Sequence, residues 1–525
     1  MTGAVLPCRP DRPSRGLPAA RKFQGADGSP ASVPTVLSGP SQPIASMFRC
    51  LPSALSAATH GLVALALCAC SAGPMRQPEA VAPGSSFRHA PSAAAAQPAP
   101  PLQQDAWWKA FGDPTLDELE ARAATGSTSI QAAAARLARA RALVRSTDAA
   151  SAPLLAVKGG AGRQGGPLIN AIGGQGTLFS GSADLSYEVD LFGRLQQATD
   201  AASLDAQGQQ ALLRDAQLLV QADVAQNYLA LRALDAERAL VQGTAAAYRE
   251  TLAITERRFR GGSVAELEWV RAQAEVAAIE SDALALERRR TQVEHALAVL
   301  TGASASLFAL PPQDWTSSLP AIPAGLPDTV LARRPDVAAA RRAIEAAQTR
   351  LGLARTAWLP QLTLTASGGT ASPTLVNVLQ ASSQVWSIGA LLGATVFDGG
   401  RRKAGIQLAD ADLESSLVSY REHVLVALRD VEDQLSALQL LAGQAQAQSA
   451  AVTLGSRAAL LADSRYRSGL ASQLDVLDAR RTELRNRREA LQVRSEQYQA
   501  TVRLIRALGG GWEAASAADR PPANP

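Results

Sequence analysis

Two pairs of segments alternate between apolar and polar residues with a period of two. From position 179 to 189 apolar side chains occupy most odd positions, while Ser, Asp and Glu occupy the even ones. From 386 to 396 apolar side chains again recur at every second position. This pattern is typical of β-strands with one apolar and one polar face. We predict strands over about 154–163, 176–190, 361–367 and 385–397, with exposed Gly/Ser-rich loops at 162–175 and 368–384.

Four longer segments without proline carry a helical pattern. We predict helices over about 194–258, 263–300, 401–467 and 472–507. At 1.5 Å per residue, each of the two longest would reach roughly 95 Å, about three bilayer thicknesses. Such helices are too long for a compact domain and suit the wall of a tube.

The last long helix carries a heptad of apolar residues. The repeat runs through Leu477, Leu484, Leu491, Tyr498 and Ile505. A sustained heptad predicts neighbouring helices packed side by side with a supercoil. Polar residues interrupt the flanking rows at Arg481, Arg488 and Ser495. We therefore expect the helix to be buried along a stripe, as in a one-layer wall around a wet lumen.

The stretch between the last two long helices places a helix stop directly before a helix start. Gly469 can adopt the left-handed conformation that ends a helix. Ser472 can cap the next helix by accepting a backbone N–H bond. A similar stretch occurs at Gly261 and Gly262. The sequence therefore predicts two tight helical hairpins.

An offset of 207 residues relates the first hairpin to the second. It aligns Arg260 with Arg467 and persists to Gly302 and Gly509. A fixed offset of this kind indicates an internal duplication of a structural unit. We assign the two copies to residues 105–302 and 328–510, joined by a proline-containing equatorial linker at 303–327.

Four amphipathic strands cannot form a membrane pore alone. Lipid tolerates no open strand edge, and the smallest single-chain barrels contain about eight strands. Several copies of the chain would therefore share one barrel. A small soluble sandwich is the alternative, but its apolar face would then lack a partner sheet. The predicted fold class is mainly α-helical with a small membrane β-barrel.

The two chain ends differ in composition from the body. Residues 1–46 are rich in Pro, Ser, Gly and Arg, which indicates disorder or an extension upstream of the true start at Met47. Residues 47–69 have a basic start and an apolar run too short to span a bilayer, which predicts a signal peptide. The tail at 511–525 is expected to be disordered.

The apolar run ends in a motif that resembles a lipid-attachment site. The string Leu67-Cys68-Ala69-Cys70-Ser71 resembles a bacterial lipobox and points to lipid attachment at Cys70. An ordinary signal peptide cleaved nearby is the alternative. The Pro/Ala/Gln-rich residues 70–104 are expected to form a flexible linker between the anchor and the body.

Composition argues against nucleic-acid binding and catalysis. The net charge is only +4, and Arg is mixed with Asp and Glu, so no basic surface is expected. All four cysteines precede residue 71, and the four histidines lack ligand spacing. We find no nucleophile–base pair, phosphate-binding loop or metal-binding motif. We predict no enzyme activity, no metal, and no cofactor other than covalent lipid.

Three motifs resemble one family. The string WWKAFGDPTL at 107–116 resembles the signature of mature outer-membrane efflux lipoproteins of the TolC/OprM/NodT type. The Cys-x-x-Gly-Pro start at 70–74 and the Arg-Arg-Pro-Asp-Val string at 333–337 resemble the same family. We assign the two tryptophans to core packing. The Arg-Arg-Pro-Asp-Val string is given a structural role, with Asp336 as a helix cap.

The resemblance implies a location, an assembly and partners. It implies a homotrimer in the bacterial outer membrane, with twelve strands, four per subunit, and with its helices in the periplasm. A periplasmic adaptor and an inner-membrane transporter would complete a tripartite efflux system. The chain would then be a passive exit duct for toxic small molecules such as antibiotics or aromatic toxins. The compound and the pump stay open.

Three other classes of protein share parts of this pattern. The exit duct of a type I protein-secretion system would have the same fold and is the alternative. A periplasmic adaptor would have a single hairpin flanked by small β domains, which the duplication argues against. A soluble coiled-coil protein would need neither the lipobox nor the strands.

The second hairpin is the candidate gate. The resemblance places it at the periplasmic tip, where the family closes its entrance with an apolar ring and an aspartate ring. These positions fall on Leu474 and Asp478, with Tyr466 and Arg467 as tethering groups. Aspartates around one axis would repel one another and attract cations, or Asp478 could merely favour the helix dipole. Candidates for adaptor docking on the first hairpin are Arg258, Arg260, Glu266 and Glu268.

Overall fold

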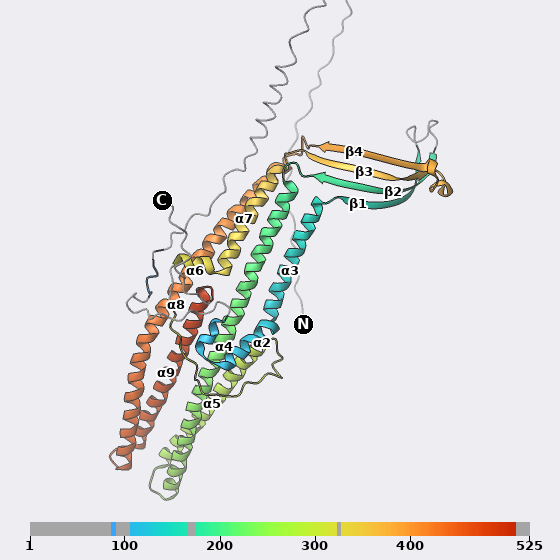
Figure 1. Ribbon diagram of the computed structural model, residues 1–525. Helices are drawn as coiled ribbons and strands as arrows, with labels where there is room; N and C mark the ends of the chain where they lie inside the picture. The colour runs from blue at the N-terminus through green and yellow to red at the C-terminus, as the bar shows by residue number, and fades with distance from the viewer. Residues whose placement is uncertain (1–83, 85, 91–105, 166–174, 323–326, 511–525) are drawn as a thin grey trace, which may run out of the picture. The chain divides into compact units, whose positions relative to one another are not determined.

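The computed structural model describes residues 84, 86–90, 106–165, 175–322 and 327–510. Helices dominate, and four strands form one antiparallel sheet in the order β1-β2-β3-β4 (Figure 1). The predicted mainly helical fold with four strands and long helical hairpins is confirmed. The predicted upstream extension, signal peptide, Cys70 and C-terminal tail lie outside the described residues.

The helices repeat at the predicted offset. Shifting α4 and α5 by 207 residues reproduces the bounds of α8 and α9, and these bounds differ from the predicted ones by at most three residues. No helix of the described ranges is both long and apolar enough to cross a membrane. The long helices are α4 (Arg194–Arg260), α5 (Glu266–Leu300), α8 (Arg401–Arg467) and α9 (Gln473–Ala507). The shorter ones are α2 (Pro114–Gly126), α3 (Thr128–Asp148), α6 (Pro327–Arg333) and α7 (Pro335–Thr356), with 3₁₀ turns η1 (Trp107–Phe111), η2 (Ala149–Ser151), η3 (Leu375–Asn377) and η4 (Ala381–Ser383).

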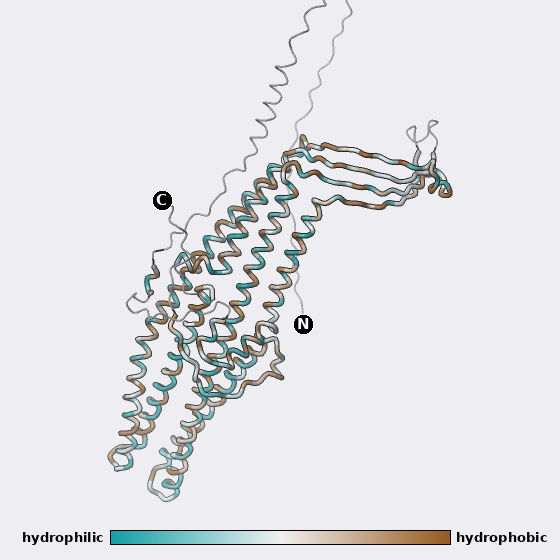
Figure 2. Tube along the Cα trace, in the orientation of Figure 1, coloured by the Kyte–Doolittle hydropathy of each residue, from teal (hydrophilic) through white to brown (hydrophobic). Residues whose placement is uncertain are grey.

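The long helices pack as neighbours in a row. In the half that leads into the sheet, contacts link α3, α4, α7 and α8 in that order. In the half that ends in the hairpins, contacts link α5, α4, α9 and α8 (Figure 1). Hydrophobic and hydrophilic residues are interspersed along these helices (Figure 2). This agrees with helices that are buried along stripes rather than all round.

The strands are β1 (Leu154–Gly165), β2 (Gln175–Val189), β3 (Gln361–Ser372) and β4 (Gln384–Gly393). Their register places the alternating apolar residues of all four strands on one face. One row across the sheet reads Leu155, Leu185, Ala366 and Ile388. The opposite face carries polar pairs, including Lys158 with Asp184 at 3.2 Å and Ser367 with Ser387 at 2.8 Å.

Two predicted strand bounds in the second copy are wrong. The expected loop at 368–384 is partly strand, because β3 continues to Ser372 opposite Phe179. Gly369 permits this pairing, since a Cβ there would lie 2.2 Å from the Gly181 carbonyl oxygen. β4 ends at Gly393 rather than 397, because its partner β3 begins only after Pro360, which has no N–H to donate.

The helices share an apolar core near their middle, where η1, α2 and the linker after α5 pack against α4. Trp107 and Phe111 are fully buried there, and Trp108 is partly buried. This placement agrees with the packing role predicted for the two tryptophans. The linker residues 303–322 form no helix or strand, yet Trp315 is buried in the same cluster.

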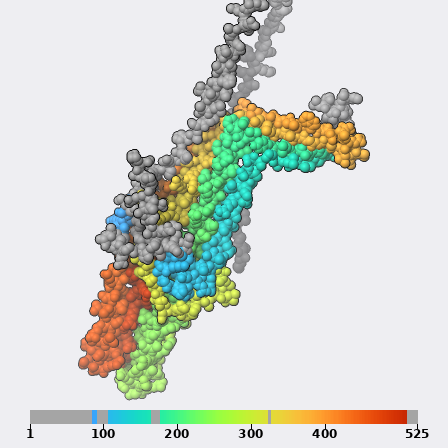
Figure 3. All heavy atoms as spheres, viewed as in Figure 1, coloured from blue at the N-terminus to red at the C-terminus, as the bar shows by residue number. Residues whose placement is uncertain are grey.

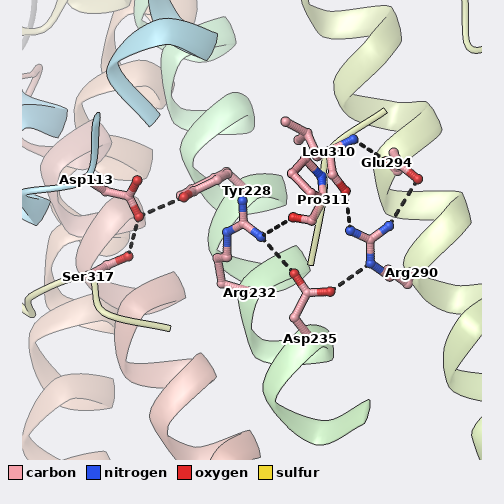
Figure 4. A network of polar contacts seen from close by, with 9 residues as sticks. All are labelled: Asp113, Tyr228, Arg232, Asp235, Arg290, Glu294, Leu310, Pro311 and Ser317. Carbon is pink, nitrogen blue, oxygen red and sulfur yellow. Dashed lines mark hydrogen bonds and ion pairs between the residues drawn. The ribbon is translucent and has the colours of Figure 1, made fainter. Parts of the chain in front are cut away.

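A buried polar network pins the linker to α4 and α5 (Figure 4). Arg232 and Arg290 donate to the two carboxylate oxygens of Asp235 at 2.8 and 2.7 Å. The same arginines also donate to the carbonyl oxygens of Pro311 and Leu310. Among the described residues, Nε and Nη2 of Arg232 have no hydrogen-bond partner, so the Asp235 carboxylate is the main compensation for its buried charge. Removing one member of the network would leave the other buried charges uncompensated. A second set of hydrogen bonds joins Asp113 to Tyr228 and Ser317.

The Arg-Arg-Pro-Asp-Val string forms a helix junction. Arg334 is buried, and its guanidinium donates to Asp336 at 2.7 Å and to the Ala507 carbonyl at 3.1 Å. Burial raises the pKa of Asp336, but the hydrogen bond and charge of Arg334 outweigh it and leave that pKa below its usual range. Asp336 is not the predicted cap, because Pro335 opens α7 and Arg334 holds the cap position. The string therefore joins α7 to the end of α9.

Glu120 of α2 is a buried acid with no ion-pair partner among the residues that the structure describes. Its side chain is 2% exposed, and neither carboxylate oxygen has a hydrogen-bond partner among the described residues. Burial, with a smaller contribution from the Asp117 carboxylate, raises the pKa of Glu120 to about 9. The folded protein therefore holds this proton at neutral pH.

Stability should consequently fall as pH rises from the ordinary Glu120 pKa of 4.5 toward 9, because only the folded state retains the proton in that window. Glu120→Gln should flatten this dependence and raise the free energy of unfolding near pH 8 by up to about 5 kcal/mol. Unfolding midpoints at pH 5 and pH 8 measure the effect. Glu118→Gln, at an exposed neighbouring position, is the control. Parallel pH profiles for wild type and Glu120→Gln would contradict the assignment.

Candidate functional site

The tip of the second hairpin has the predicted stop and start. Gly469 has φ +73°, and the backbone N–H of Leu470 returns to the carbonyl of Arg465. Ser472 and Asp475 form a reciprocal capping box at the start of α9. The hydrogen bonds from the Ser472 N–H and hydroxyl lower the pKa of Asp475. These local interactions define where α8 ends and α9 begins.

The tip of the first hairpin has a different chemistry. Gly262 has φ +71°, but Ala265 at the cap position offers no side-chain acceptor. Phe259 and Trp269 stack across the hairpin with ring centroids 5.1 Å apart. An aromatic stack thus joins the two arms here, whereas a capping box fixes the start of the return helix in the second hairpin.

Side chains near the tips connect the two hairpins, which end side by side (Figure 3). Arg258 donates to the Tyr466 hydroxyl at 2.8 Å. Buried Gln473 donates to the hydroxyl of Thr255 at 3.2 Å. Arg480 contacts Thr251 of the first hairpin at 3.4 Å and Asp463 of the second at 3.3 Å.

Two arginines of α9 extend these connections away from the tip. Arg481 pairs with Glu275 of α5, with 3.0 Å between Nε and Oε2. Arg488 donates to Glu237 of α4 at 2.7 Å and to Asp282 of α5 at 2.9 Å. These five residues line a groove of about 740 Å³ between the hairpins. The contacts are polar and partly exposed, so they can break at modest cost.

The predicted gate residues lie at the start of α9. Leu474 is 45% exposed, and the Asp478 side chain is 69% exposed with Arg481 at 3.7 Å. The Tyr466 hydroxyl accepts a hydrogen bond from Arg258 of the first hairpin. Arg467 instead pairs with Asp463 of its own helix at 2.7 Å.

The predicted docking residues do not all have free side chains. Arg258 is engaged with Tyr466, and Arg260 pairs with Glu256 one turn earlier in α4. Glu266 is exposed and Glu268 is half-buried, both in the first turn of α5. Of these four residues, Glu266 is the most open to a partner.

Sequence analysis missed most of the inter-hairpin contacts. Arg481 and Arg488 appear in the sequence only as interruptions of an apolar pattern, and Gln473 and Arg480 carry no motif. Arg481 and Arg488 are seven residues apart and therefore lie on one face of α9. This spacing is the sequence signal that could have predicted a shared partner surface. Among the described residues, no group of three or more His, Cys, Asp or Glu could hold a metal ion.

Comparison with known proteins assigns the chain to a family. The family model described as outer membrane efflux protein matches residues 120–303 and 326–510. The chain belongs to the outer membrane efflux protein family. Both matched segments fall on the two copies of the duplicated unit, each with its strand pair and hairpin.

Curated relatives span nearly the same length. The efflux protein is 34% identical over 475 residues to the pyoverdine export outer membrane protein OpmQ of Pseudomonas putida, covering 86% of this chain and 97% of the relative. It is 30% identical over 458 residues to the cation efflux system protein CusC of Escherichia coli, covering 86% and 98%.

Solved structures agree with this assignment. A crystal structure of CusC matches with a TM-score of 0.74 and 27% identity, covering 84% of this chain and all of that one. The outer-membrane channel OprN matches with the same TM-score, identity and coverage. The protein is thus an efflux channel protein of the bacterial outer membrane, and the prediction that it is not an enzyme is confirmed.

Proposed function

We propose that this outer membrane efflux protein is one subunit of a homotrimeric exit duct in a tripartite pump. The sheet carries the proposal. Its apolar face includes Trp386 and Ile388, which are 78% and 79% exposed. Within the described residues, β1 and β4 have no partner strand on their outer edges. Neighbouring copies would pair these edges, and three copies would supply twelve strands for one barrel.

The helices support a duct that continues below the membrane. α4 and α8 have 67 residues each, so each reaches about 100 Å at 1.5 Å per residue. Helices in a single row, buried along stripes, leave one face for water. In a closed ring of such rows, that face would line the lumen in the periplasm. Lipid attached at Cys70 would anchor the chain to the outer membrane in addition to the barrel.

The partners we propose are a periplasmic adaptor at the hairpin tips and an inner-membrane transporter. Exposed Leu267, Glu266 and Leu470 support contact at the tips, because they offer both charged and apolar surface. Arg258 and Arg260 would contribute after leaving their present partners, and Glu268 borders the same surface.

The cargo we propose is toxic small molecules, such as antibiotics or aromatic toxins. Relatives are named for export of pyoverdine, cations and toluene, so similar chains serve chemically different cargo. A wide passive duct imposes little selectivity of its own. Export of protein in a type I secretion system is the second candidate, and only the inner-membrane partner would distinguish it.

The gate we propose is the ring of Leu474 and Asp478 at the start of α9, with Tyr466 as a tether. The inter-hairpin contacts of Arg480 and Arg481 support this role, because they hold α9 against the first hairpin. Arg467 would act only indirectly, by binding Asp463 beside Arg480.

A conductance measurement tests the gate. The combined variant Tyr466→Phe, Arg480→Ala and Arg481→Ala should raise the open fraction about tenfold, because three partly exposed contacts of about 0.5 kcal/mol each are lost. Asp478→Ala alone should reduce cation preference. Single-channel recording in planar bilayers measures both.

Arg260→Ala is the matched control, because that arginine pairs within its own helix. If the triple variant conducts like Arg260→Ala, these contacts do not hold the gate. If neither wild type nor variant conducts after insertion, the duct itself is rejected.

A further inference from the structure

Residues 86–90 do not behave as the flexible linker expected for the whole of 70–104. Phe87 is only 5% exposed and belongs to an apolar cluster with residues of α6, α8 and α9. The Ala90 N–H donates to the Phe87 carbonyl at 3.3 Å, which closes a small turn. We call residues 86–90 the N-terminal clasp.

Polar contacts fix the clasp to α8. The backbone N–H groups of Arg88 and His89 donate to the two carboxylate oxygens of Glu432 at 2.7 and 3.4 Å. The His89 ring nitrogen Nδ1 lies 3.3 Å from Oε1 of Gln439. Glu432 and Gln439 are seven residues apart and so lie on one face of α8. The clasp is therefore held by the burial of Phe87 and by polar contacts with Glu432 and Gln439 of α8.

The internal duplication shows which residues of the first copy correspond to the clasp. The pocket around Phe87 includes Val330, Val431, Leu435 and Leu504. Shifted back by 207 residues, these positions are Ala123, Val224, Tyr228 and Leu297. All four belong to the core cluster that contains Trp107 and Phe111. The equivalent pocket in the first copy is thus filled by the aromatic residues of η1.

The second copy does not fill its own pocket in this way. Trp315 lies 207 residues after Trp108, but it packs in the first cluster, 4.8 Å from the ring of Tyr498. The aromatic group at the second pocket is Phe87, from the start of the described chain.

We propose that the N-terminal clasp is an intramolecular docking element that completes the apolar cluster between α6, α8 and α9 of the second copy. It ties the N-terminal segment to the middle of α8 and to the end of α9. Phe87 follows Cys70 by 17 residues, which limits their separation to about 60 Å in an extended chain. If the proposed lipid is attached at Cys70, the clasp would also limit the reach of the anchor. The docking itself does not depend on the proposed channel.

Limited trypsin digestion of the full mature protein in detergent tests the clasp. Trypsin can cut after Arg88 inside the clasp and after Arg76 upstream, which serves as an internal reference. Cleavage inside a docked segment requires local opening. Phe87→Ala should raise the ratio of Arg88 to Arg76 cleavage rates about tenfold, and Phe87→Leu should largely restore it. Mass spectrometry of the early fragments gives both rates.

Two further variants keep the test interpretable. Glu432→Ala should raise the same ratio severalfold, because it removes the acceptor of two backbone N–H groups without touching the apolar pocket. It carries the test if Phe87→Ala does not fold. Leu307→Ala removes an equally apolar side chain at an 88% exposed position and should leave the ratio unchanged.

An unchanged ratio in both Phe87→Ala and Glu432→Ala would overturn the proposal. A raised ratio with intact channel conductance would support the clasp separately from the proposed duct. Loss of conductance with an unchanged ratio would bear on the duct and still reject the clasp.

Discussion

Replacing Asp235 by alanine should cost about 3–5 kcal/mol of folding free energy, because it leaves two buried arginines without their shared counter-charge. The side chains of Arg232, Asp235 and Arg290 are 1–7% exposed. The loss would also release the linker, since the same guanidinium groups hold the carbonyls of Leu310 and Pro311. Chemical unfolding in detergent, followed by circular dichroism, measures the change.

Asp463→Ala is the matched control for this prediction. Asp463 also accepts from two arginines, Arg467 and Arg480, but all three side chains are 24–76% exposed. Water can replace the lost carboxylate there, so we expect a cost below about 1 kcal/mol. Equal costs at Asp235 and Asp463 would show that burial does not set the strength of the network.

Gly302→Ala should destabilise the protein by more than about 3 kcal/mol, through backbone strain and a backbone clash together. Gly302 has φ +72°, and a Cβ there would lie 2.1 Å from the Gly126 carbonyl oxygen. The contact joins the end of α5 to the end of α2, so neither backbone can move without opening the core. The unfolding midpoint and the yield of folded protein measure the effect.

Gly262→Ala separates the two causes. Gly262 has almost the same φ, +71°, but nothing lies within 4 Å of its Cβ position. We expect a cost of only about 1–2 kcal/mol, from the left-handed backbone alone. If both substitutions cost the same, the close approach of α5 to α2 plays no part.

The sequence predicted the elements that have a strong local period. Alternation fixed which strand residues share a face, because a one-residue error would reverse the whole pattern. The offset of 207 predicted that α8 and α9 repeat α4 and α5. Strand ends were less predictable, since pairing beyond Gly368 depends on a neighbouring strand that local sequence does not contain.

Long-range contacts were the least predictable part. Arg488 of α9 binds Glu237 of α4, which lies 251 residues earlier in the chain. Phe87 packs against residues of α6, α8 and α9. The local sequence pattern around Arg488 and Phe87 does not indicate these contacts. Phe87 lies in a stretch whose Pro/Ala/Gln composition is typical of linkers. A single aromatic residue in such a stretch does not predict a docked segment. The gate residues Leu474 and Asp478 came from family resemblance, and their roles stay predictions.

The mass of the detergent-extracted protein tests the central claim most directly, because a four-stranded sheet with an exposed apolar face requires other copies to close it. Native mass spectrometry, supported by chemical cross-linking, should give a particle of three chains. A stable, folded particle of one chain would contradict a shared duct.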